Sequence, residues 1–273
     1  MKPKIKSLVV LLLLSCALTG QAQETRTADS GLWHGYRILD STLNGRDFKV
    51  AFPENANKNR DWIWRARFWG HEPQTDLALL GQGFHVAYID VAGLFGNDEA
   101  VSIWDGFYSM VTEKYHLNPR VVLEGMSRGG LIIYNWANRN AEKVACIYGD
   151  APVCDFKSWP MGLGTGSGSE PALKACLSVY GFDEEEAIAF KGNPVDHMEN
   201  IARAQVPILH VVGDADEVVP VSENTDMLKT RLNELGWDLN LIHKPGVGHH
   251  PHSLADPKPI VDFILIHTGN RFE

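Results

Sequence analysis

The sequence predicts an α/β fold with a mostly parallel sheet and helices on both of its faces. Short apolar runs rich in Val and Ile alternate along the chain with longer segments whose apolar residues recur every three or four positions. The first pattern is typical of buried strands and the second of amphipathic helices. Strands that alternate with helices pair in parallel, so we expect the active residues at the carboxyl ends of the strands.

The expected elements begin with a hairpin, because Asn44-Gly45 separates two strand-like segments and this dipeptide favours a tight hairpin turn. The predicted strands cover residues 36–39, 48–52, 61–68, 84–91, 121–125, 144–148, 206–212 and 239–242. The predicted helices cover residues 77–80, 98–115, a segment from 131 onward, 222–235 and 257–267. The insertion between residues 155 and 203 has room only for a small helical cap, with a mobile glycine-rich loop over residues 161–169.

The stretch 121–130 reads Val-Val-Leu-Glu-Gly-Met-Ser-Arg-Gly-Gly and predicts a strand, a sharp turn and a helix. Ser127 stands at the turn, where its backbone angles are strained and side chains two residues away would collide with the strand and the helix. Gly125 and Gly129 remove both collisions. Such a turn exposes the serine hydroxyl and points the first helical N–H groups at a substrate. An ordinary glycine-rich turn is the alternative interpretation.

Two later strand ends carry an acid and a histidine. Gly213-Asp214-Ala215-Asp216 follows one predicted strand, and Gly248-His249-His250 follows the last one. The resulting chain order is serine, aspartate, histidine, as in α/β-hydrolases.

From about Gly35 to its C-terminus, the chain resembles the α/β-hydrolase superfamily, in particular small secreted esterases related to the dienelactone hydrolase and prolyl oligopeptidase branches. The resemblance implies that Ser127 is the nucleophile, that Asp216 is the acid in a G-x-x-D-x-x-V-P pattern, and that His249 is the base. The tryptophans near residues 62–69 and the Gly-His-His-Pro-His segment are similar to a subgroup of secreted bacterial enzymes that degrade polysaccharides.

Alternatives remain for the acid and the base. Asp214 could take the place of Asp216, although the spacing to Val219-Pro220 favours Asp216, and His250 could take the place of His249. The neighbouring histidines could also bind zinc, but adjacent histidines on a proline-broken loop rarely converge on one metal. The sequence therefore predicts no metal and no cofactor.

The remaining site predictions concern the oxyanion and the substrate. We expect the backbone N–H groups of Arg128 and His71 to stabilise the oxyanion, with Trp69 or Gly70 as the alternatives to His71. Flat aromatic faces bind sugar rings, so Trp159 and Trp69 are the predicted substrate-binding residues. The other tryptophans at 62, 64, 104 and 136 fall within strand or helix patterns and are expected in the core.

Buried charges are expected behind the serine. The strands that carry Glu124 and the pair Arg65 and Arg67 should be neighbours, which predicts an ion pair from Glu124 to one of these arginines.

The Arg128 side chain has two interpretations. The favoured one is an ion pair with Asp150 or Asp155 at the end of the next strand, and the other is contact with an anionic substrate such as a uronate.

Residues 1–22 are expected to form a signal peptide, which leaves residues 23–273 as a single catalytic domain. Three lysines precede the apolar run of residues 8–14, and small residues precede Gln23. Leu13-Leu14-Ser15-Cys16 also resembles a lipoprotein cleavage box, so an anchor at Cys16 is the alternative to soluble export to the periplasm or the cell exterior.

The net charge bears on whether the protein binds nucleic acid, and the cysteines bear on whether it forms a disulfide. The chain has 25 Lys and Arg residues against 34 Asp and Glu residues, and without the three lysines of the expected signal peptide its formal net charge is −12. This charge excludes nucleic acid as a natural partner. In an oxidising compartment Cys154 and Cys176 could form a disulfide across the glycine-rich loop.

Together these patterns predict a secreted serine hydrolase that cleaves carboxylic esters through an acyl-enzyme, with an ester-substituted carbohydrate as its substrate. A prolyl oligopeptidase-like peptidase is the first alternative, because the same three residues also cleave peptides. A catalytically silent glycan-binding protein is the second, and the intact serine, aspartate and histidine argue against it.

Overall fold

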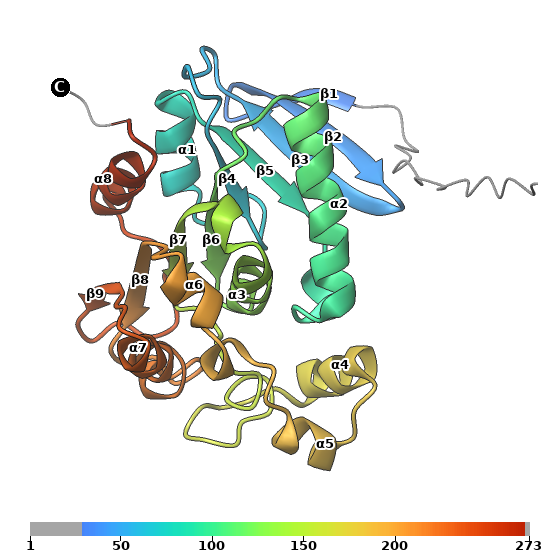
Figure 1. Ribbon diagram of the computed structural model, residues 1–273, viewed down its shortest axis with the longest axis vertical. Coiled ribbons are helices and arrows are strands. Elements are labelled where there is room, and N and C mark those ends of the chain that lie inside the picture. Colours follow the sequence, from blue (N-terminus) through green and yellow to red (C-terminus); the bar gives the residue numbers. More distant parts are fainter. Residues whose placement is uncertain (1–28, 271–273) are drawn as a thin grey trace, which may run out of the picture.

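The computed structural model describes residues 29–270, and this part of the chain is built around one nine-stranded sheet (Figure 1). The strand order is β1-β2-β3-β5-β4-β6-β7-β8-β9. The first three strands pair antiparallel, β3 pairs antiparallel with β5, and the strands from β5 through β4 to β9 are parallel. The predicted α/β fold with a mostly parallel sheet is confirmed.

The strands are β1 (Asp29–Trp33), β2 (Tyr36–Leu43), β3 (Arg46–Phe52), β4 (Trp62–Arg65), β5 (His85–Ile89), β6 (Val121–Met126), β7 (Val144–Asp150), β8 (Ile208–Gly213) and β9 (Asn240–Lys244). The α-helices are α1 (Gln74–Gly81), α2 (Asp98–Lys114), α3 (Gly129–Arg139), α4 (Glu170–Tyr180), α5 (Glu184–Ala189), α6 (Glu199–Arg203), α7 (Thr225–Glu234) and α8 (Lys258–His267). The short 3-10 helices are η1 (Ala92–Leu94), η2 (Ala141–Lys143), η3 (Pro194–Asp196) and η4 (Val221–Glu223).

The N-terminal hairpin forms as its turn dipeptide predicts. Asn44 and Gly45 both have positive φ, 50° and 79°, and this pair of angles matches the right-handed twist of the two strands that they join. Two strands differ from the expectation, and the first is β1, which was not predicted. The strand predicted over residues 61–68 ends at Arg65, because the chain leaves the sheet at Ala66 and Phe68 adopts a φ of 55°.

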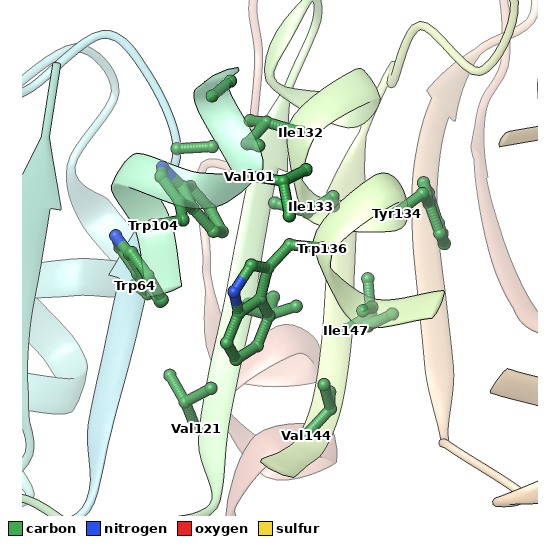
Figure 2. Packing of buried hydrophobic residues seen from close by; sticks show 14 of the residues in the cluster. Trp64, Val101, Trp104, Val121, Ile132, Ile133, Tyr134, Trp136, Val144 and Ile147 are labelled. Carbon is green, nitrogen blue, oxygen red and sulfur yellow. The ribbon is translucent and has the colours of Figure 1, made fainter. Parts of the chain in front are cut away.

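Helices cover both faces of the sheet with separate apolar layers. On one face α1 and α8 pack together over residues such as Ile63, Val86 and Val122. On the other face α2, α3 and α7 cover a larger layer that contains the tryptophans at 62, 64, 104 and 136, which are all fully buried as predicted. Figure 2 shows Trp104 lying over Trp64, with ring centroids 3.8 Å apart and planes 17° apart.

The segment between β7 and β8 forms a small cap with α4 and α5, which Figure 1 shows beyond one end of the parallel strands. Its glycine-rich loop, expected to be mobile, is instead bonded to Glu223, which accepts hydrogen bonds from the Thr165 hydroxyl at 2.7 Å and from the Thr165 backbone. Ser158, three residues before the loop, donates to the same carboxylate at 2.7 Å.

The expected disulfide is absent, since Cys154 and Cys176 are both free and buried. Cys154 packs in the layer beneath α3 and α7, whereas Cys176 packs in the cluster of the cap. Burial raises the pKa of both thiols, so each is held as a neutral, apolar side chain.

Within residues 29–270 no helix is both long enough and apolar enough to span a bilayer. The expected signal peptide and Cys16 lie outside the described residues.

Candidate active site

Ser127 stands on a strained turn between β6 and α3. Its φ is 51°, in the left-handed region that a non-glycine residue rarely adopts. Three backbone hydrogen bonds hold it there: its N–H donates to the Asp150 carbonyl at 2.8 Å, and its carbonyl accepts from the N–H groups of Gly130 and Val153, each at 2.9 Å. Such overdetermined strain is typical of a functional position.

Close packing around the turn explains its glycines. A Cβ on Gly125 would lie 2.4 Å from the Ile133 side chain, and one on Gly130 would lie 2.4 Å from the Val153 carbonyl oxygen. Gly129 is less crowded, because its nearest neighbour would be the Ala66 Cβ at 3.3 Å. The collision expected at Gly125 is therefore present, while the collision with the backbone occurs at Gly130, which the sequence motif did not single out.

Ser127, His249 and Asp216 form one chain of hydrogen bonds. Ser127 Oγ is 2.9 Å from His249 Nε2, and His249 Nδ1 is 2.7 Å from Asp216 Oδ2. The other Asp216 oxygen accepts from the backbone N–H groups of Val218 at 2.9 Å and Val219 at 2.8 Å. The side chains of His249 and Asp216 are buried, so this pair is shielded from water.

The alternative acid and base lie elsewhere. Asp214 is 2.6 Å from His243 Nδ1 at an exposed position beside β9. His250 is exposed, and its ring centroid is 5.1 Å from that of His249. Among the acids and histidines at these two strand ends, the structure brings Asp216 and His249 to the serine.

The loop of His249 is anchored at the end of β7. Asp150 accepts from His252 Nδ1 at 2.7 Å, from the Ser253 N–H at 2.7 Å and from the Tyr148 hydroxyl at 2.5 Å. Burial alone would raise the pKa of Asp150, but the hydrogen bonds and the charge of His252 lower it below its ordinary value. The carboxylate thereby fixes the histidine loop beside Ser127.

Behind the serine, Arg65 joins the two sheet strands to the next helix. Its Nη1 lies 2.5 Å from Asp76 of α1 and 3.0 Å from Glu124 of β6, and all three side chains are buried. The predicted ion pair of Glu124 is confirmed, with Arg65 rather than Arg67 as its partner. Burial raises the pKa of Glu124 well above its ordinary value, although Arg65 opposes this shift.

Arg65 also holds the loop after β4. Its Nε donates to the carbonyl oxygens of Arg67 and Phe68, each at 3.1 Å, and its Nη2 donates to the carbonyl of His71. One planar guanidinium thus fixes three peptide groups of a loop that borders the start of α3.

The expected oxyanion donor His71 is contradicted. Its backbone N–H donates to the Phe68 carbonyl at 3.0 Å and closes a turn, so this group is already used. Arg67 lies beside the serine turn: its backbone nitrogen would be 4.0 Å from a Cβ on Gly129, at the first position of α3. The other expected donor, Arg128, precedes Gly129 at the N-cap of this helix.

The Arg128 side chain makes neither of the expected ion pairs. Asp150 is occupied by His252, and Asp155 lies 3.7 Å from Lys157. The Arg128 guanidinium instead lies over two aromatic rings, 4.8 Å from the centroid of Phe95 and 5.3 Å from that of Trp159.

The two tryptophans predicted to bind substrate have different surroundings. Trp159 is half-buried beside Arg128, with its ring stacked 6.3 Å from Phe95. Trp69 packs against Trp33 at 4.7 Å and Tyr88 at 6.1 Å. The structure therefore brings Trp159 to a side chain next to Ser127, and places Trp69 in an aromatic group on the N-terminal part of the sheet.

Three histidines converge beside the serine. One ligand atom from each of His249, His250 and His252 lies within 4.8 Å of the others, which corrects the expectation that these side chains diverge. Two of the three already donate through Nδ1 to buried carboxylates, Asp216 and Asp150. Such carboxylate-histidine pairs also orient metal ligands, so the residues present fit a divalent cation as well as a proton acceptor.

The open, mostly parallel sheet with a serine on the sharp turn after β6 identifies an α/β-hydrolase. A model of the prolyl oligopeptidase family matches residues 74–269, and the chain belongs to this family of serine hydrolases. No curated protein matches the chain in sequence.

Solved structures with the same fold include a puromycin hydrolase, a dipeptidyl peptidase and an acetyl xylan esterase. A puromycin hydrolase is 14% identical to this chain with a TM-score of 0.62. The match covers 92% of this chain and 40% of the puromycin hydrolase. Dipeptidyl peptidase 4 of Porphyromonas gingivalis is 13% identical with a TM-score of 0.64. The match covers 86% of this chain and 36% of the peptidase. Acetyl xylan esterase 1 from Thermoanaerobacterium sp. JW/SL YS485 is 17% identical with a TM-score of 0.61. The match covers 90% of this chain and 88% of the esterase. The chain thus spans 40% of the length of the puromycin hydrolase and 36% of the length of the dipeptidyl peptidase.

Phe95, Asp76 and Arg67 were not predicted to be part of the site. Phe95 follows η1 and has a φ of 48°, and nothing in its sequence neighbourhood indicates that it faces Arg128. Asp76 lies in a short helix where an acid in the first turn is ordinary. For Arg67 the sequence did give an indication. The expected strand placed two arginines near Glu124, and only one of them could be the partner of this acid, which left the other available for the site.

Proposed function

We propose that this protein is a serine esterase that cleaves carboxylic esters through an acyl-enzyme on Ser127. The observation that carries the proposal is the chain of hydrogen bonds from Ser127 Oγ through His249 to Asp216. A serine hydroxyl is a weak nucleophile until a neighbouring base accepts its proton, and His249 Nε2 lies at the distance that this transfer needs.

The reaction follows from these positions. Ser127 Oγ attacks the acyl carbon while His249 Nε2 accepts the hydroxyl proton, and the Asp216 carboxylate stabilises the imidazolium. The tetrahedral intermediate then breaks its bond to the alcohol, which leaves with the proton from His249. A water molecule then gives a proton to His249 as its oxygen attacks the acyl-serine. The second tetrahedral intermediate breaks its bond to Ser127 Oγ, His249 returns the proton to this oxygen, and the carboxylic acid leaves.

Two backbone N–H groups are proposed to stabilise the oxyanion. Arg128 supplies one at the start of α3, as the sequence predicts, and Arg67 supplies the other in place of His71. Arg65 positions the second donor by binding the Arg67 and Phe68 carbonyls. Loss of one such donor typically costs about 3 kcal/mol of transition-state stabilisation.

An esterified carbohydrate is the proposed substrate class. Trp159 offers a half-buried aromatic face next to Arg128, and sugar rings pack on such faces. The acetyl xylan esterase matches along 88% of its length, and its name agrees with an esterified carbohydrate as substrate. Its 17% identity shows a shared fold only. A peptidase activity is the second candidate, because the chain belongs to the prolyl oligopeptidase family.

The N-terminal residues support a proposal on location. Lysines followed by an apolar run and small residues favour export, with Cys16 as the site of an alternative lipid anchor. The mature N-terminus, measured by mass spectrometry of the protein from its native host, distinguishes cleavage before Gln23 from a lipidated Cys16 and from an uncleaved chain.

The test compares wild type with Ser127→Ala on short-chain aryl acetates and butyrates, and on acetylated xylan and pectin. Ser109→Ala, at an exposed position of α2, is the matched control. We expect wild type and the control to release acetate and Ser127→Ala to be slower by a factor of about 10⁴ or more. Cleavage of dipeptidyl amides without ester turnover would favour the peptidase, and an unchanged rate in Ser127→Ala would refute the nucleophile.

A further inference from the structure

Two arginines beside the serine have no acidic partner. Arg128 follows Ser127 directly, and Arg67 lies on the loop whose backbone packs against Gly129. Within residues 29–270 neither guanidinium forms an ion pair or a side-chain hydrogen bond, and the Nε atoms of both are buried without a partner. By contrast, the neighbouring Arg65 has its two acids and three carbonyls.

The two charges also disfavour each other. Burial and the positive charge of Arg67 lower the pKa of Arg128 to about 10, and burial lowers the pKa of Arg67. Asp90 and Tyr88 act on Arg67 in the opposite direction, but Asp90 is exposed and lies beyond ion-pair distance. Half-buried like charges without an ion-paired acid cost folding free energy, and an anion bound between them would remove that cost.

Aromatic rings hold both guanidinium groups. Arg128 lies over Phe95 and Trp159, and Arg67 lies over Phe68 at 4.3 Å from the ring centroid. A guanidinium stacked on a ring keeps its N–H donors free at the edge of its plane. Those donors match a carboxylate, which accepts two parallel hydrogen bonds from one guanidinium.

We propose that Arg67 and Arg128 form a subsite for a carboxylate of the substrate, next to the ester that Ser127 attacks. This inference rests on the proposed esterase function and narrows its substrate class to anionic esters. The carboxylate belongs either to the sugar, as in an acetylated uronate, or to the acyl group, as in the half-ester of a dicarboxylic acid. Contact with a uronate was the second interpretation of the Arg128 side chain from the sequence. Because Asp150 and Asp155 pair with other residues, the structure favours this second interpretation.

The experiment compares matched anionic and neutral esters in wild type, Arg67→Gln and Arg128→Gln. Acetylated galacturonate oligosaccharides are compared with their methyl esters, and nitrophenyl hemisuccinate is compared with nitrophenyl butyrate. The readout is the ratio of kcat/KM for the anionic ester to that for its neutral partner. Arg46→Gln, which loses only the exposed pair with Glu99, is the control.

We expect wild type and the control to prefer one anionic ester by roughly 10- to 100-fold, and each site variant to lose most of that ratio. The pair of esters that shows the preference identifies whether the sugar or the acyl group carries the carboxylate. Added sodium chloride should lower the ratio, because salt screens the guanidinium charges. A ratio near one in wild type, or a ratio that both site variants keep, would overturn the subsite.

A binding measurement separates this inference from the proposed function. Turnover of nitrophenyl butyrate reports the esterase function by itself. If no ester is cleaved, that function fails, and binding of trigalacturonate to Ser127→Ala still decides the subsite. Trigalacturonate should raise the thermal midpoint of this variant, and its methyl ester should not. The same shift in Ser127→Ala combined with Arg128→Gln would show that the anion binds elsewhere.

Discussion

Around the serine, two pairs of chemically identical residues lie close together in sequence but have different surroundings. Asp216 and Asp214 are two positions apart, and His249 and His250 are neighbours, yet one member of each pair joins the chain of hydrogen bonds to Ser127. Asp216 is also fixed by two backbone N–H groups, whereas Asp214 contacts only the exposed His243 and the backbone around it. The proposed roles therefore predict unequal effects for chemically identical substitutions.

Asp216→Asn should lower kcat by about 10³- to 10⁴-fold, because an amide no longer stabilises the imidazolium and allows the wrong tautomer of His249. Asp214→Asn, the matched control, should change kcat less than twofold. The measurement is the hydrolysis of nitrophenyl butyrate by both variants under identical conditions. Equal losses in the two variants would contradict the assignment of Asp216.

Among the structural elements, the loop after β4 depends on one buried side chain. Arg65 connects this loop to β6 through Glu124 and to α1 through Asp76. The position of the proposed oxyanion donor therefore depends on three elements together, because the loop's own hydrogen bond, from His71 to Phe68, does not connect it to β6 or to α1.

Arg65→Met should destabilise the protein by about 3–5 kcal/mol, since it leaves two buried acids without their cation. Arg46→Met removes an exposed ion pair with Glu99 and should cost less than about 1 kcal/mol. Urea unfolding of both variants gives the comparison. A loss below about 1 kcal/mol in Arg65→Met would show that the buried cluster does not stabilise the fold.

The histidine loop predicts how metals affect the enzyme. His249 already uses both ring nitrogens, toward Ser127 and Asp216, so a cation bound to it would compete with proton transfer. We expect chelators to leave ester turnover unchanged and micromolar zinc to inhibit it. His250→Ala removes one ligand outside the proposed reaction and should raise the inhibitory zinc concentration about tenfold or more. Activity that falls on chelation would contradict this prediction.

At the scale of the whole molecule, buried ionisable groups lie where the site, the sheet and the covering helices meet. His210 of β8 is fully buried and contacts Thr225 of α7 at 2.9 Å and the Tyr134 hydroxyl of α3. Burial lowers the pKa of His210 to about 3, although Asp150 acts in the opposite direction.

This shift makes the stability depend on pH. Between about pH 6.5 and pH 3 the unfolded chain takes up a proton on His210 and the folded protein does not, so the free energy of unfolding falls as pH falls. The slope from one such group reaches about 1.4 kcal/mol per pH unit. Urea unfolding from pH 7 to pH 4 should show a shallower dependence in His210→Gln than in wild type or in the exposed control His116→Gln. Parallel curves for all three proteins would contradict this role.

Local sequence patterns determined much of the fold. The hairpin at Asn44-Gly45, the glycines around Ser127 and the periodic spacing of α2 each act within a few residues, through the backbone angles and faces that those residues allow. The same locality explains the errors, since the end of β4 at Arg65 depends on a turn without glycine at Phe68. The five-residue strand β1 is too short for a clear alternation.

The choice of residues within the site was made by tertiary structure. The sequence alone determined that a serine, an acid and a histidine each follow a different strand, because each lies next to a recognisable local motif. Only the fold decided that His71 closes a turn, that Arg65 takes both acids, that the two cysteines stay apart and that Arg128 faces Phe95. Apart from the turn at His71, these features depend on segments that are distant along the chain, so they follow from how whole elements pack and leave no pattern near either residue.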